Sequence, residues 1–300
     1  MSDNDFVFEQ GELVDVSNPV ENDFVYIRNQ LISDAEESDF SFIRNRGIGG
    51  IGIPDFVFEK GFIWWPFDEG SGGTVNDALD GGHHGSINGP SWLSNDWHGG
   101  NALSSTGSGN FVSTTTWGDW FSQINTNFWL AFTVSTTHDG TNSQDPQFIG
   151  ESHTFDQTEW IQVGMGINDS FFGTATGDQM GMSLRDSAGD IIAIETDTSP
   201  LTDGSPHRYV VNKVSNSGSG AMEWYVDGQP VPTSLIVDQG FLDTGTIHDM
   251  LHPAYLFAEN DDGDLNNEGS GIMDNILIGQ PGTTLTEEEI AEDWDWQPWT

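Results

Sequence analysis

Short strand-like segments separated by turn residues are the feature that most constrains the fold of this chain. From about residue 61 onward, apolar runs alternate with clusters of Gly, Asn, Ser and Asp, with almost no helical periodicity. The clearest runs are residues 127–135, 159–166, 190–195, 208–214, 223–226 and 271–279. Many short strands with glycine-rich turns are typical of a β-sandwich or jelly roll. The sequence therefore predicts an all-β fold.

Two local signals refine this prediction. Asp227-Gly228 lies between a strand-like run and Val231, and Asp-Gly at such a place favours a type I′ hairpin turn. Near the C-terminus, Thr286 followed by Glu289 forms a capping-box pattern, and three consecutive glutamates favour the positive end of a helix dipole. We expect one short terminal helix from about residue 287 to 294.

The segment 1–60 is organised differently, because four related phrases recur there. They occupy residues 5–11, 23–29, 39–45 and 55–61, at nearly regular intervals, which is the mark of an internal repeat. Side chains two positions apart share a strand face, so the phrases predict short one-sided strands that need a partner surface. The partner can be the downstream domain, a second copy or another protein. The interface residues predicted on this basis are Phe6, Phe8, Phe24, Tyr26, Arg28, Phe40, Phe42, Arg44, Phe56 and Phe58.

These patterns divide the chain into a repetitive N-terminal arm, residues 1–60, and one large β domain, residues 61–300. The arm holds four of the seven basic residues, namely Arg28, Arg44, Arg46 and Lys60. Scarce positive charge within repeats favours pairing with carboxylates at an interface. We therefore expect the arm to mediate anchoring or homo-oligomerisation.

The charge balance excludes several functions. With 48 acidic against 7 basic residues, the net charge is −41, which repels a nucleic-acid backbone. There is no cysteine and no apolar run of the roughly 20 residues that a membrane helix needs. Asp outnumbers Glu by 31 to 17 and there are two lysines, a composition suited to concentrated salt. The N-terminus lacks the pattern of a secretion signal, so we expect the protein to be made and retained on the cytoplasmic side, where a virion can assemble, or to leave the cell by lysis.

Residues 64–92, WWPFDEGSGGTVNDALDGGHHGSINGPSW, resemble the opening of laminin G-like, concanavalin A-like jelly-roll domains. The resemblance continues at residues 99–103, at 207–228 with RYVVNK and WYVDG, and at 271–278 followed by LTEEEIAEDW. It covers about residues 61–294 in the family's order. It implies a jelly-roll sandwich with a lectin-like role, because such domains usually recognise glycans or proteins.

In this family a structural calcium ion commonly lies near the sandwich rim. The resemblance carries that expectation onto Asp77, Asp80 and Asp274 as ligands, with Ca²⁺ as the implied cofactor. The acidic segment 259–268 also resembles a cation loop, but a solvated acidic loop is the favoured interpretation.

An enzymatic alternative comes from the same superfamily. Laminarinase-type endoglucanases carry E-x-D-x-x-E on a strand, and the nearest approach here is Glu259, Asp261 and Asp264 in an expected loop. The last glutamate of the pattern is missing, so we expect a non-enzymatic protein. The tryptophans that are candidates for stacking on sugar rings are Trp117, Trp120, Trp129, Trp294, Trp296 and Trp299.

Together these features lead to one functional hypothesis. An acidic surface, a repetitive arm and a lectin-like head are expected of a virion surface component of a halophilic archaeal virus, such as a capsid turret, spike or tail fibre. The expected partners are other virion proteins through the arm and a host surface glycan through the head, without nucleic acid or membrane insertion. The alternatives are a cellular halophilic lectin or adhesin, and a glycoside hydrolase.

Overall fold

The computed structural model describes residues 6–9, 12–15, 53–94, 100–107, 109–114, 118–137, 147–152, 159–165, 179–197, 203–248, 254–261, 264–266 and 269–296. The chain divides into two compact units, Met1–Ile53 and Pro54–Thr300. In the first unit, β1 (Phe6–Glu9) pairs antiparallel with β2 (Glu12–Asp15). The predicted strand within residues 5–11 is therefore confirmed. The predicted interface residues Phe24, Tyr26, Arg28, Phe40, Phe42 and Arg44 lie outside the described residues.

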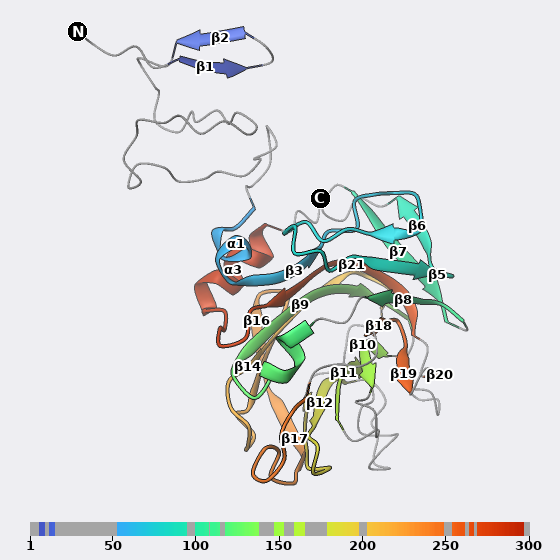
Figure 1. Cartoon of the computed structure of the whole chain (residues 1–300), viewed down its shortest axis with the longest axis vertical. Coiled ribbons are helices and arrows are strands. Elements are labelled where there is room, and N and C mark those ends of the chain that lie inside the picture. Colours follow the sequence, from blue (N-terminus) through green and yellow to red (C-terminus); the bar gives the residue numbers. More distant parts are fainter. Residues whose placement is uncertain are drawn as a thin grey trace, which may run out of the picture. The chain divides into compact units, whose positions relative to one another are not determined.

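The second unit is an all-β jelly-roll sandwich of two antiparallel sheets (Figure 1). The eight-stranded sheet runs in the order β16-β15-β14-β9-β21-β7-β6, with β3 paired to β21. Its strands are β3 (Gly61–Trp65), β6 (Ser91–Ser94), β7 (Asn101–Thr106), β9 (Phe128–Ser135), β14 (His207–Lys213), β15 (Met222–Val226), β16 (Gln229–Val231) and β21 (Ser270–Gly279). A short 3₁₀ helix, η2 (Gly118–Gln123), precedes β9.

The nine-stranded sheet runs in the order β17-β13-β12-β11-β10-β18-β8-β5-β4. Its strands are β4 (Thr74–Val75), β5 (Gly85–Asn88), β8 (Phe111–Thr114), β10 (Gln147–Ser152), β11 (Trp160–Met165), β12 (Met180–Arg185), β13 (Ile191–Thr196), β17 (Thr233–Asp238) and β18 (Tyr255–Leu256). The two sheets enclose one large core, which includes Trp65, Phe132, Ile161, Met182 and Trp224. Since alternate side chains of each strand enter this core, the other set defines the two outer faces.

The outer face of the eight-stranded sheet is covered by helix α3 (Glu287–Asp295) and the segment before it. The predicted capping box is present, because Thr286 Oγ1 accepts a hydrogen bond from Glu289 N and the Glu289 carboxylate accepts one from Thr286 N. On β14, Arg208 forms an ion pair with Asp293 of the helix, at 2.8 Å between Nε and Oδ2. Further along the same face, Asn212 exchanges two hydrogen bonds with the backbone of Leu285. The predicted terminal helix is thus confirmed and held by the sheet.

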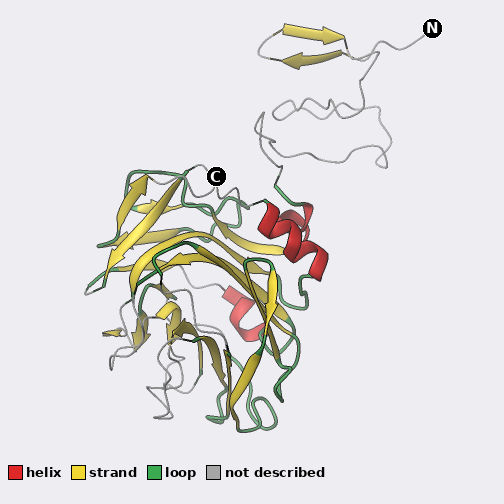
Figure 2. Cartoon of the chain, turned by 180° about the vertical axis from the view of Figure 1, so that it is seen from behind, coloured by secondary structure: helices red, strands yellow, loops and turns green. Residues whose placement is uncertain are grey.

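A second helix, α1 (Asp55–Lys60), covers the same outer face (Figure 2). Phe56 is buried with its ring centroid 5.8 Å from that of Trp129 on β9, and Phe58 lies against Trp64 at 6.5 Å. The Nζ atom of Lys60 lies 2.7 Å from the Glu289 carboxylate. The strand predicted for residues 55–61 is therefore wrong. The compact unit begins at Pro54, before α1, rather than at residue 61.

Packing explains this difference. As a helix, the phrase buries Phe56 and Val57 together and directs Lys60 toward α3, whereas a strand would direct neighbouring residues to opposite faces. Most helical stability in proteins comes from such tertiary contacts rather than from local preference. The predicted Asp227-Gly228 turn is confirmed, since both residues have positive φ, 52° and 73°, between β15 and β16. Within the described residues, no helix combines the length and apolarity that crossing a membrane requires.

Candidate functional site

The three predicted calcium ligands do not gather into one site. Asp77 is buried, and its carboxylate accepts hydrogen bonds from the backbone N–H groups of Trp64, Leu79 and His83, at 3.2, 3.1 and 3.4 Å. These bonds tie the loop after β4 to β3, which is a structural task. Asp80 is exposed and occupies a left-handed turn position with φ 58°.

Asp274 is buried on β21, where one carboxylate oxygen accepts a hydrogen bond from Asn275 N at 2.8 Å. Burial raises its pKa well above the ordinary value, and the neighbouring Asp68 carboxylate raises that pKa further. Among the residues that the structure describes, no three His, Cys, Asp or Glu side chains are arranged to hold a metal ion. Calcium also takes backbone carbonyl oxygens as ligands, so the calcium site at Asp77, Asp80 and Asp274 stays a prediction.

The acidic segment near residue 260 is a hairpin rather than the expected loop. β19 (Glu259–Asp261) pairs with β20 (Asp264–Asn266), and Asp261 lies opposite Asp264. Of the tryptophans considered for sugar stacking, Trp120 and Trp129 are buried in the unit. Trp294 and Trp296 are half-buried, with Trp296 against Trp64, while Trp117 and Trp299 lie outside the residues with described side chains.

The outer face of the nine-stranded sheet carries a different group of side chains, which we call the Trp160 corner: Trp160, Gln162, Ser183, Arg185 and His248. Trp160 on β11 lies opposite Arg185 on β12, and the guanidinium carbon is 4.5 Å from the centre of the indole ring. The Trp160 Nε1–H donates to Ser183 Oγ at 2.9 Å, and Ser183 Oγ donates to Gln162 Oε1 at 3.3 Å. A small apolar cluster of Trp160, Ile191 and Ala193 supports this face.

His248 lies at the same end of β11. Glu159, directly before Trp160, is buried, and its Oε1 accepts hydrogen bonds from both His248 N and His248 Nδ1, at 3.0 and 2.6 Å. The imidazole itself is 65% exposed. The buried carboxylate therefore fixes one ring nitrogen of His248 and leaves the rest of the ring accessible beside the sheet face.

The loops around the Trp160 corner are fixed by Asp186, which follows β12 and is buried. Its Oδ1 accepts hydrogen bonds from the N–H groups of Ala188 and Asp190, and its Oδ2 accepts one from Leu242 N. One carboxylate thus joins the turn after β12 to the segment that leads to His248. A pre-organised rim of this kind lowers the entropy that ligand binding must overcome.

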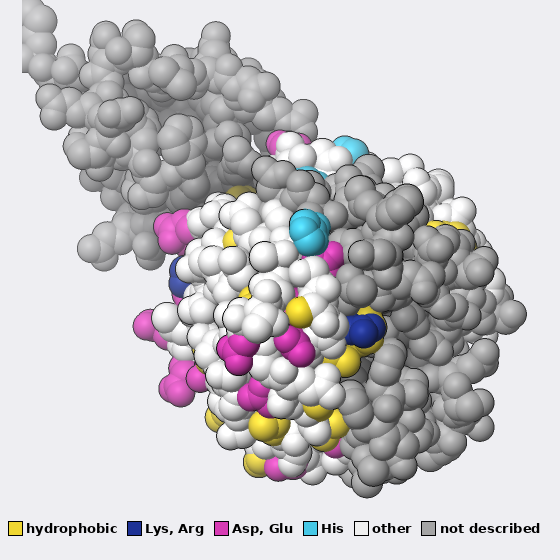
Figure 3. Space-filling model, turned by 60° about the horizontal axis from the view of Figure 1, so that its bottom comes forward, with side chains coloured by type: hydrophobic (Ala, Val, Ile, Leu, Met, Phe, Trp, Pro, Cys, Tyr) yellow, Lys and Arg dark blue, Asp and Glu magenta, His cyan; other side chains and the backbone are white. Residues whose placement is uncertain are grey.

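Arg185 is electrostatically distinct from the other described cations. Lys60 and Arg208 are paired with carboxylates, and Lys213 is buried against backbone carbonyls. Arg185 is half-buried, its Nε donates to Gly189 O at 3.2 Å, and within the described residues no carboxylate pairs with it. Figure 3 shows a face of the molecule on which acidic side chains are scattered and Lys or Arg side chains are few. Arg185 is therefore available to an acidic or hydroxyl-bearing ligand.

Sequence reasoning missed the Trp160 corner. Its members come from segments that are far apart in the sequence, so only strand pairing brings Trp160, Ser183 and Arg185 together. The one signal in the sequence was the scarcity of basic residues, because Arg185 is one of three after residue 60. A basic residue such as Arg185 is rare in so acidic a domain, and this rarity marks it as a candidate functional residue.

No known family model matches the sequence, and no curated protein is similar to it in sequence. Several solved structures share its fold. The binding domain of Paraclostridial Mosquitocidal Protein 1 matches with a TM-score of 0.55 and 11% identity, covering 79% of this chain and 52% of that chain. The binding domain of botulinum neurotoxin serotype D matches with a TM-score of 0.52 and 13% identity, covering 78% and 50%.

A Trypanosoma rangeli sialidase, in complex with 2,3-difluorosialic acid, matches with a TM-score of 0.52 and 15% identity, covering 82% of this chain and 34% of the sialidase. This chain thus spans about half of the two binding domains and a third of the sialidase. At these identities the matches show the fold alone, and they confirm the predicted jelly-roll sandwich. The laminin G-like subtype stays a prediction.

Proposed function

We propose that this chain is a non-enzymatic binding protein whose head recognises a glycan at the Trp160 corner. The observation that carries the proposal is a pair of accessible polar groups beside the outer face of the nine-stranded sheet. Arg185 is half-buried and no described carboxylate pairs with it, and the His248 side chain is 65% exposed, whereas Trp160, Gln162 and Ser183 are themselves buried.

The chemistry of the corner suits a sugar bearing carboxylate or sulfate groups. A guanidinium offers several donors in a planar fork, which matches acidic groups, and its position over the Trp160 ring fixes its orientation. The exposed edge of His248 adds a further polar contact. Concentrated salt shortens the Debye length to roughly 3 Å, so the net charge of the chain does not exclude an anionic ligand there.

The comparisons support a binding role at the level of fold. The mosquitocidal-protein and serotype D matches are both binding domains, and a further match, the binding domain of botulinum neurotoxin DC, is in complex with rat synaptotagmin II. Fold similarity does not by itself transfer a ligand. The experiment must therefore distinguish a glycan ligand from a protein ligand at the Trp160 corner.

The test is binding of the full chain, in multimolar salt, to a panel of sulfated, uronate-containing and neutral polysaccharides. Arg185→Gln is expected to weaken binding to the acidic members at least tenfold, because a hydrogen bond to a charged group contributes about 1.5–3 kcal/mol. Arg46→Gln removes the same charge from the other unit and serves as the matched control.

Equal binding by wild type and Arg185→Gln would refute the Trp160 corner as the site. Binding to no polysaccharide, together with Arg185-dependent binding to a host surface protein, would assign the corner to a protein ligand instead. Release of sugar products by the wild type would contradict the non-enzymatic role and support the glycoside hydrolase alternative.

We further propose that the chain is a surface component of a halophilic archaeal virus, such as a turret, spike or tail fibre. The net charge of −41 and the repeated phrases of the segment 1–60 support this setting. Immunogold labelling of purified virions tests it directly. Labelling of host cell envelopes in uninfected cultures would favour the cellular lectin or adhesin.

A further inference from the structure

A buried carboxylate lies beside the most exposed side chain of the Trp160 corner. Glu159 directly precedes β11 and is buried, and its Oε1 atom accepts hydrogen bonds from His248 N at 3.0 Å and from His248 Nδ1 at 2.6 Å. Its Oε2 atom is buried and has no hydrogen-bond partner among the described residues. Burying a carboxylate is costly. A buried carboxylate that is bonded twice to one histidine points to a role in the chemistry of that imidazole.

The two hydrogen bonds fix the tautomer of His248. An ionised carboxylate can only accept hydrogen bonds, so the hydrogen between Nδ1 and Glu159 Oε1 belongs to Nδ1. A neutral imidazole carries one ring hydrogen, and its other ring nitrogen is then an acceptor. The bond from His248 N to the same oxygen fixes the backbone that carries the ring. In its neutral form His248 therefore presents Nε2 as a hydrogen-bond acceptor, on a side chain that is 65% exposed.

The other members of the Trp160 corner offer no accessible acceptor. The Arg185 guanidinium has N–H donors and cannot accept a hydrogen bond. The Trp160 Nε1–H is also a donor, and it is bonded to Ser183 Oγ. Ser183 and Gln162 carry acceptor atoms, but both residues are buried. Since sugar hydroxyls donate as well as accept hydrogen bonds, a hydroxyl hydrogen at this corner has His248 Nε2 as its accessible side-chain acceptor.

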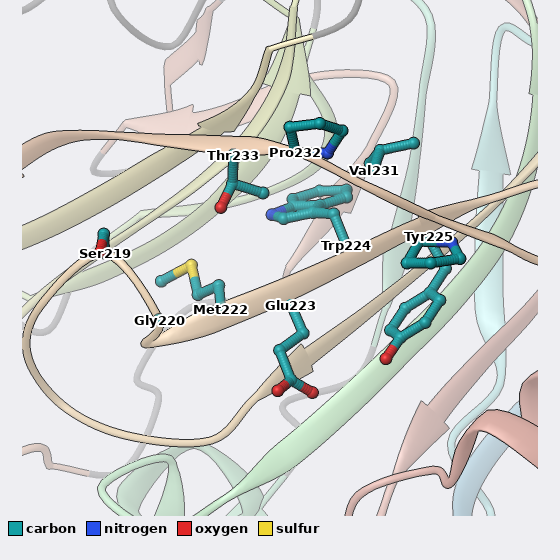
Figure 4. Close-up of a pocket in the computed structure, with 10 residues that line it drawn as sticks. Ser219, Gly220, Met222, Glu223, Trp224, Tyr225, Val231, Pro232 and Thr233 are labelled. Atoms are coloured by element: carbon teal, nitrogen blue, oxygen red, sulfur yellow. The ribbon is translucent and has the colours of Figure 1, made fainter.

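A hollow between β15 and β17 does not offer the same chemistry. It encloses about 290 Å³, and Figure 4 shows the Trp224 ring and Met222 beside each other at its wall. Both side chains are 1% exposed, so they belong to the core rather than to an open surface. Glu223 also lines the hollow and is exposed, and its charge opposes an acidic ligand. The Trp160 corner is therefore the better place for an acidic sugar.

We propose that Glu159 is a positioning residue that holds His248 as an acceptor, and that this acceptor selects acidic polysaccharides with free hydroxyl groups over those whose hydroxyls are sulfated. The inference rests on the glycan binding proposed for the Trp160 corner. A hydroxyl can donate to Nε2, whereas a sulfate ester has only acceptor oxygens. A site built for a hydroxyl discriminates strongly against an analogue that lacks it. Arg185 attracts the acidic groups of both ligands, so it supplies affinity without this selectivity. A polysaccharide spans several sugar units, so Arg185 and His248 can contact different units of one ligand.

The first experiment examines the imidazole without a ligand. The full chain is labelled with ¹⁵N-histidine, and nitrogen NMR spectra are recorded in multimolar salt at alkaline pH, beyond the last change of the His248 signal with pH. His248→Phe identifies that signal by its absence. The expected result is a protonated Nδ1 and an unprotonated Nε2. Glu159→Met removes the acceptor, so in that variant the hydrogen is expected to be shared between the two nitrogens. A wild type whose Nε2 carries the hydrogen, or a tautomer that Glu159→Met leaves unchanged, would overturn positioning by Glu159.

The second experiment compares a uronate polysaccharide with its O-sulfated derivative, in multimolar salt that screens the additional charge. The wild type is expected to bind the unsulfated form about tenfold more tightly, because the sulfated form leaves the Nε2 acceptor without a hydrogen. His248→Phe is expected to bind both forms equally, and so is Glu159→Met/His248→Phe, which leaves no buried carboxylate without its partner. Arg185→Gln should weaken both and keep the preference. His84→Gln, directly before β5 near the other end of the nine-stranded sheet, is the matched control and should change neither affinity.

The outcomes separate this inference from the proposed function. Arg185-dependent binding without a preference for the unsulfated form, or a preference that persists in His248→Phe, would overturn the selectivity and leave glycan binding intact. Binding of neither form would refute glycan binding at the Trp160 corner, and this inference with it. Loss of the preference in both His248 variants, while Arg185→Gln stays selective, would support the assigned role of His248.

Discussion

At the scale of single residues, the described basic side chains have specific structural tasks. Arg208 and Asp293 are fully buried, and the guanidinium makes two 2.8 Å hydrogen bonds to the carboxylate. Arg208 also donates to Thr133 Oγ1 and to Asn275 O. These contacts satisfy a charge that would otherwise be costly inside the protein.

Removing Arg208 or Asp293 alone is therefore expected to lower the free energy of unfolding more than removing both. Asp293→Ala is expected to lower the free energy of unfolding by about 3–5 kcal/mol, because it leaves the Arg208 charge buried without its partner. The double variant Arg208→Met/Asp293→Leu is expected to lose less. Urea unfolding at fixed high salt measures both. A double variant less stable than Asp293→Ala would contradict this account.

Lys213 gives the protein a defined pH response. Its ammonium group is buried, donates to Ile124 O and Thr126 O at 2.9 Å, and also to Asn216. Burial lowers the pKa of Lys213 from 10.5 to about 8. Between these two values the unfolded chain binds a proton that the folded protein does not, so stability rises with pH across that interval.

The free energy of unfolding is expected to increase by about 3 kcal/mol across this pH interval, because each unit of pKa difference contributes about 1.36 kcal/mol. Burial raises the pKa of Tyr209, so above pH ~10 the unfolded chain ionises its tyrosine first and stability falls again. Urea unfolding from pH 7 to 11 should show a maximum between these limits. Lys213→Met should abolish the rise, and Lys60→Met, the matched control, should keep it.

At the scale of elements, one pentapeptide adopts two structures. Residues 5–9 and 55–59 are both Asp-Phe-Val-Phe-Glu. The first copy contributes β1, which pairs with β2, and the second forms most of α1 on the outer face of the sheet. The local sequence is identical, so the contacts around each copy decide the structure.

The identical phrases provide a matched pair of substitutions. Phe56→Ala is expected to lower the unfolding free energy of the Pro54–Thr300 unit by about 3–5 kcal/mol, because it removes a buried aromatic ring that packs on Trp129. Phe6→Ala is expected to leave the unfolding of that unit unchanged. Near-ultraviolet circular dichroism, which reports the buried tryptophans, follows the transition. Equal effects of the two changes would contradict the assignment of α1 to this unit.

Strand alternation and turn residues located six strands and the terminal helix of the second unit. The predicted runs correspond to β9, β11, β13, β14, β15 and β21, and the capping box gave α3. The β19–β20 hairpin differs from the expected loop because its composition is acidic and it lacks an alternating apolar pattern that would mark strands. Its two short strands depend on pairing with each other.

At the scale of the whole molecule, the charge of −41 makes stability dependent on salt. The Debye length falls from about 10 Å at 0.1 M to about 3 Å at 1 M, so repulsion between surface carboxylates is screened over that range. The urea midpoint is expected to rise steeply between these two KCl concentrations. Replacing the exposed Glu59 and Glu223 by Gln should raise the low-salt midpoint and leave the high-salt midpoint unchanged. A flat salt response would contradict adaptation to concentrated salt.

The division into two units also changes how the assembly role of the arm should be tested. A fragment beginning at Gly61 would lack α1 and expose Trp129, whereas one beginning at Pro54 retains the whole compact unit. In multimolar salt, we expect the full chain to form assemblies with more copies than the fragment that begins at Pro54. Light scattering measures the mass of each assembly, and dividing by the chain mass gives the number of copies. Equal association states would contradict an assembly role for residues 1–53.

The sequence by itself determined the fold class, the terminal helix and the hairpin turn, because strand alternation, capping boxes and Asp-Gly turns depend on residues close together in the chain. Tertiary structure decided the rest. It made the second Asp-Phe-Val-Phe-Glu a helix, separated Asp77, Asp80 and Asp274, and brought Arg185 over Trp160. Each of these outcomes depends on which distant strands become neighbours, and the energy of a buried contact is defined only when both partners are in place.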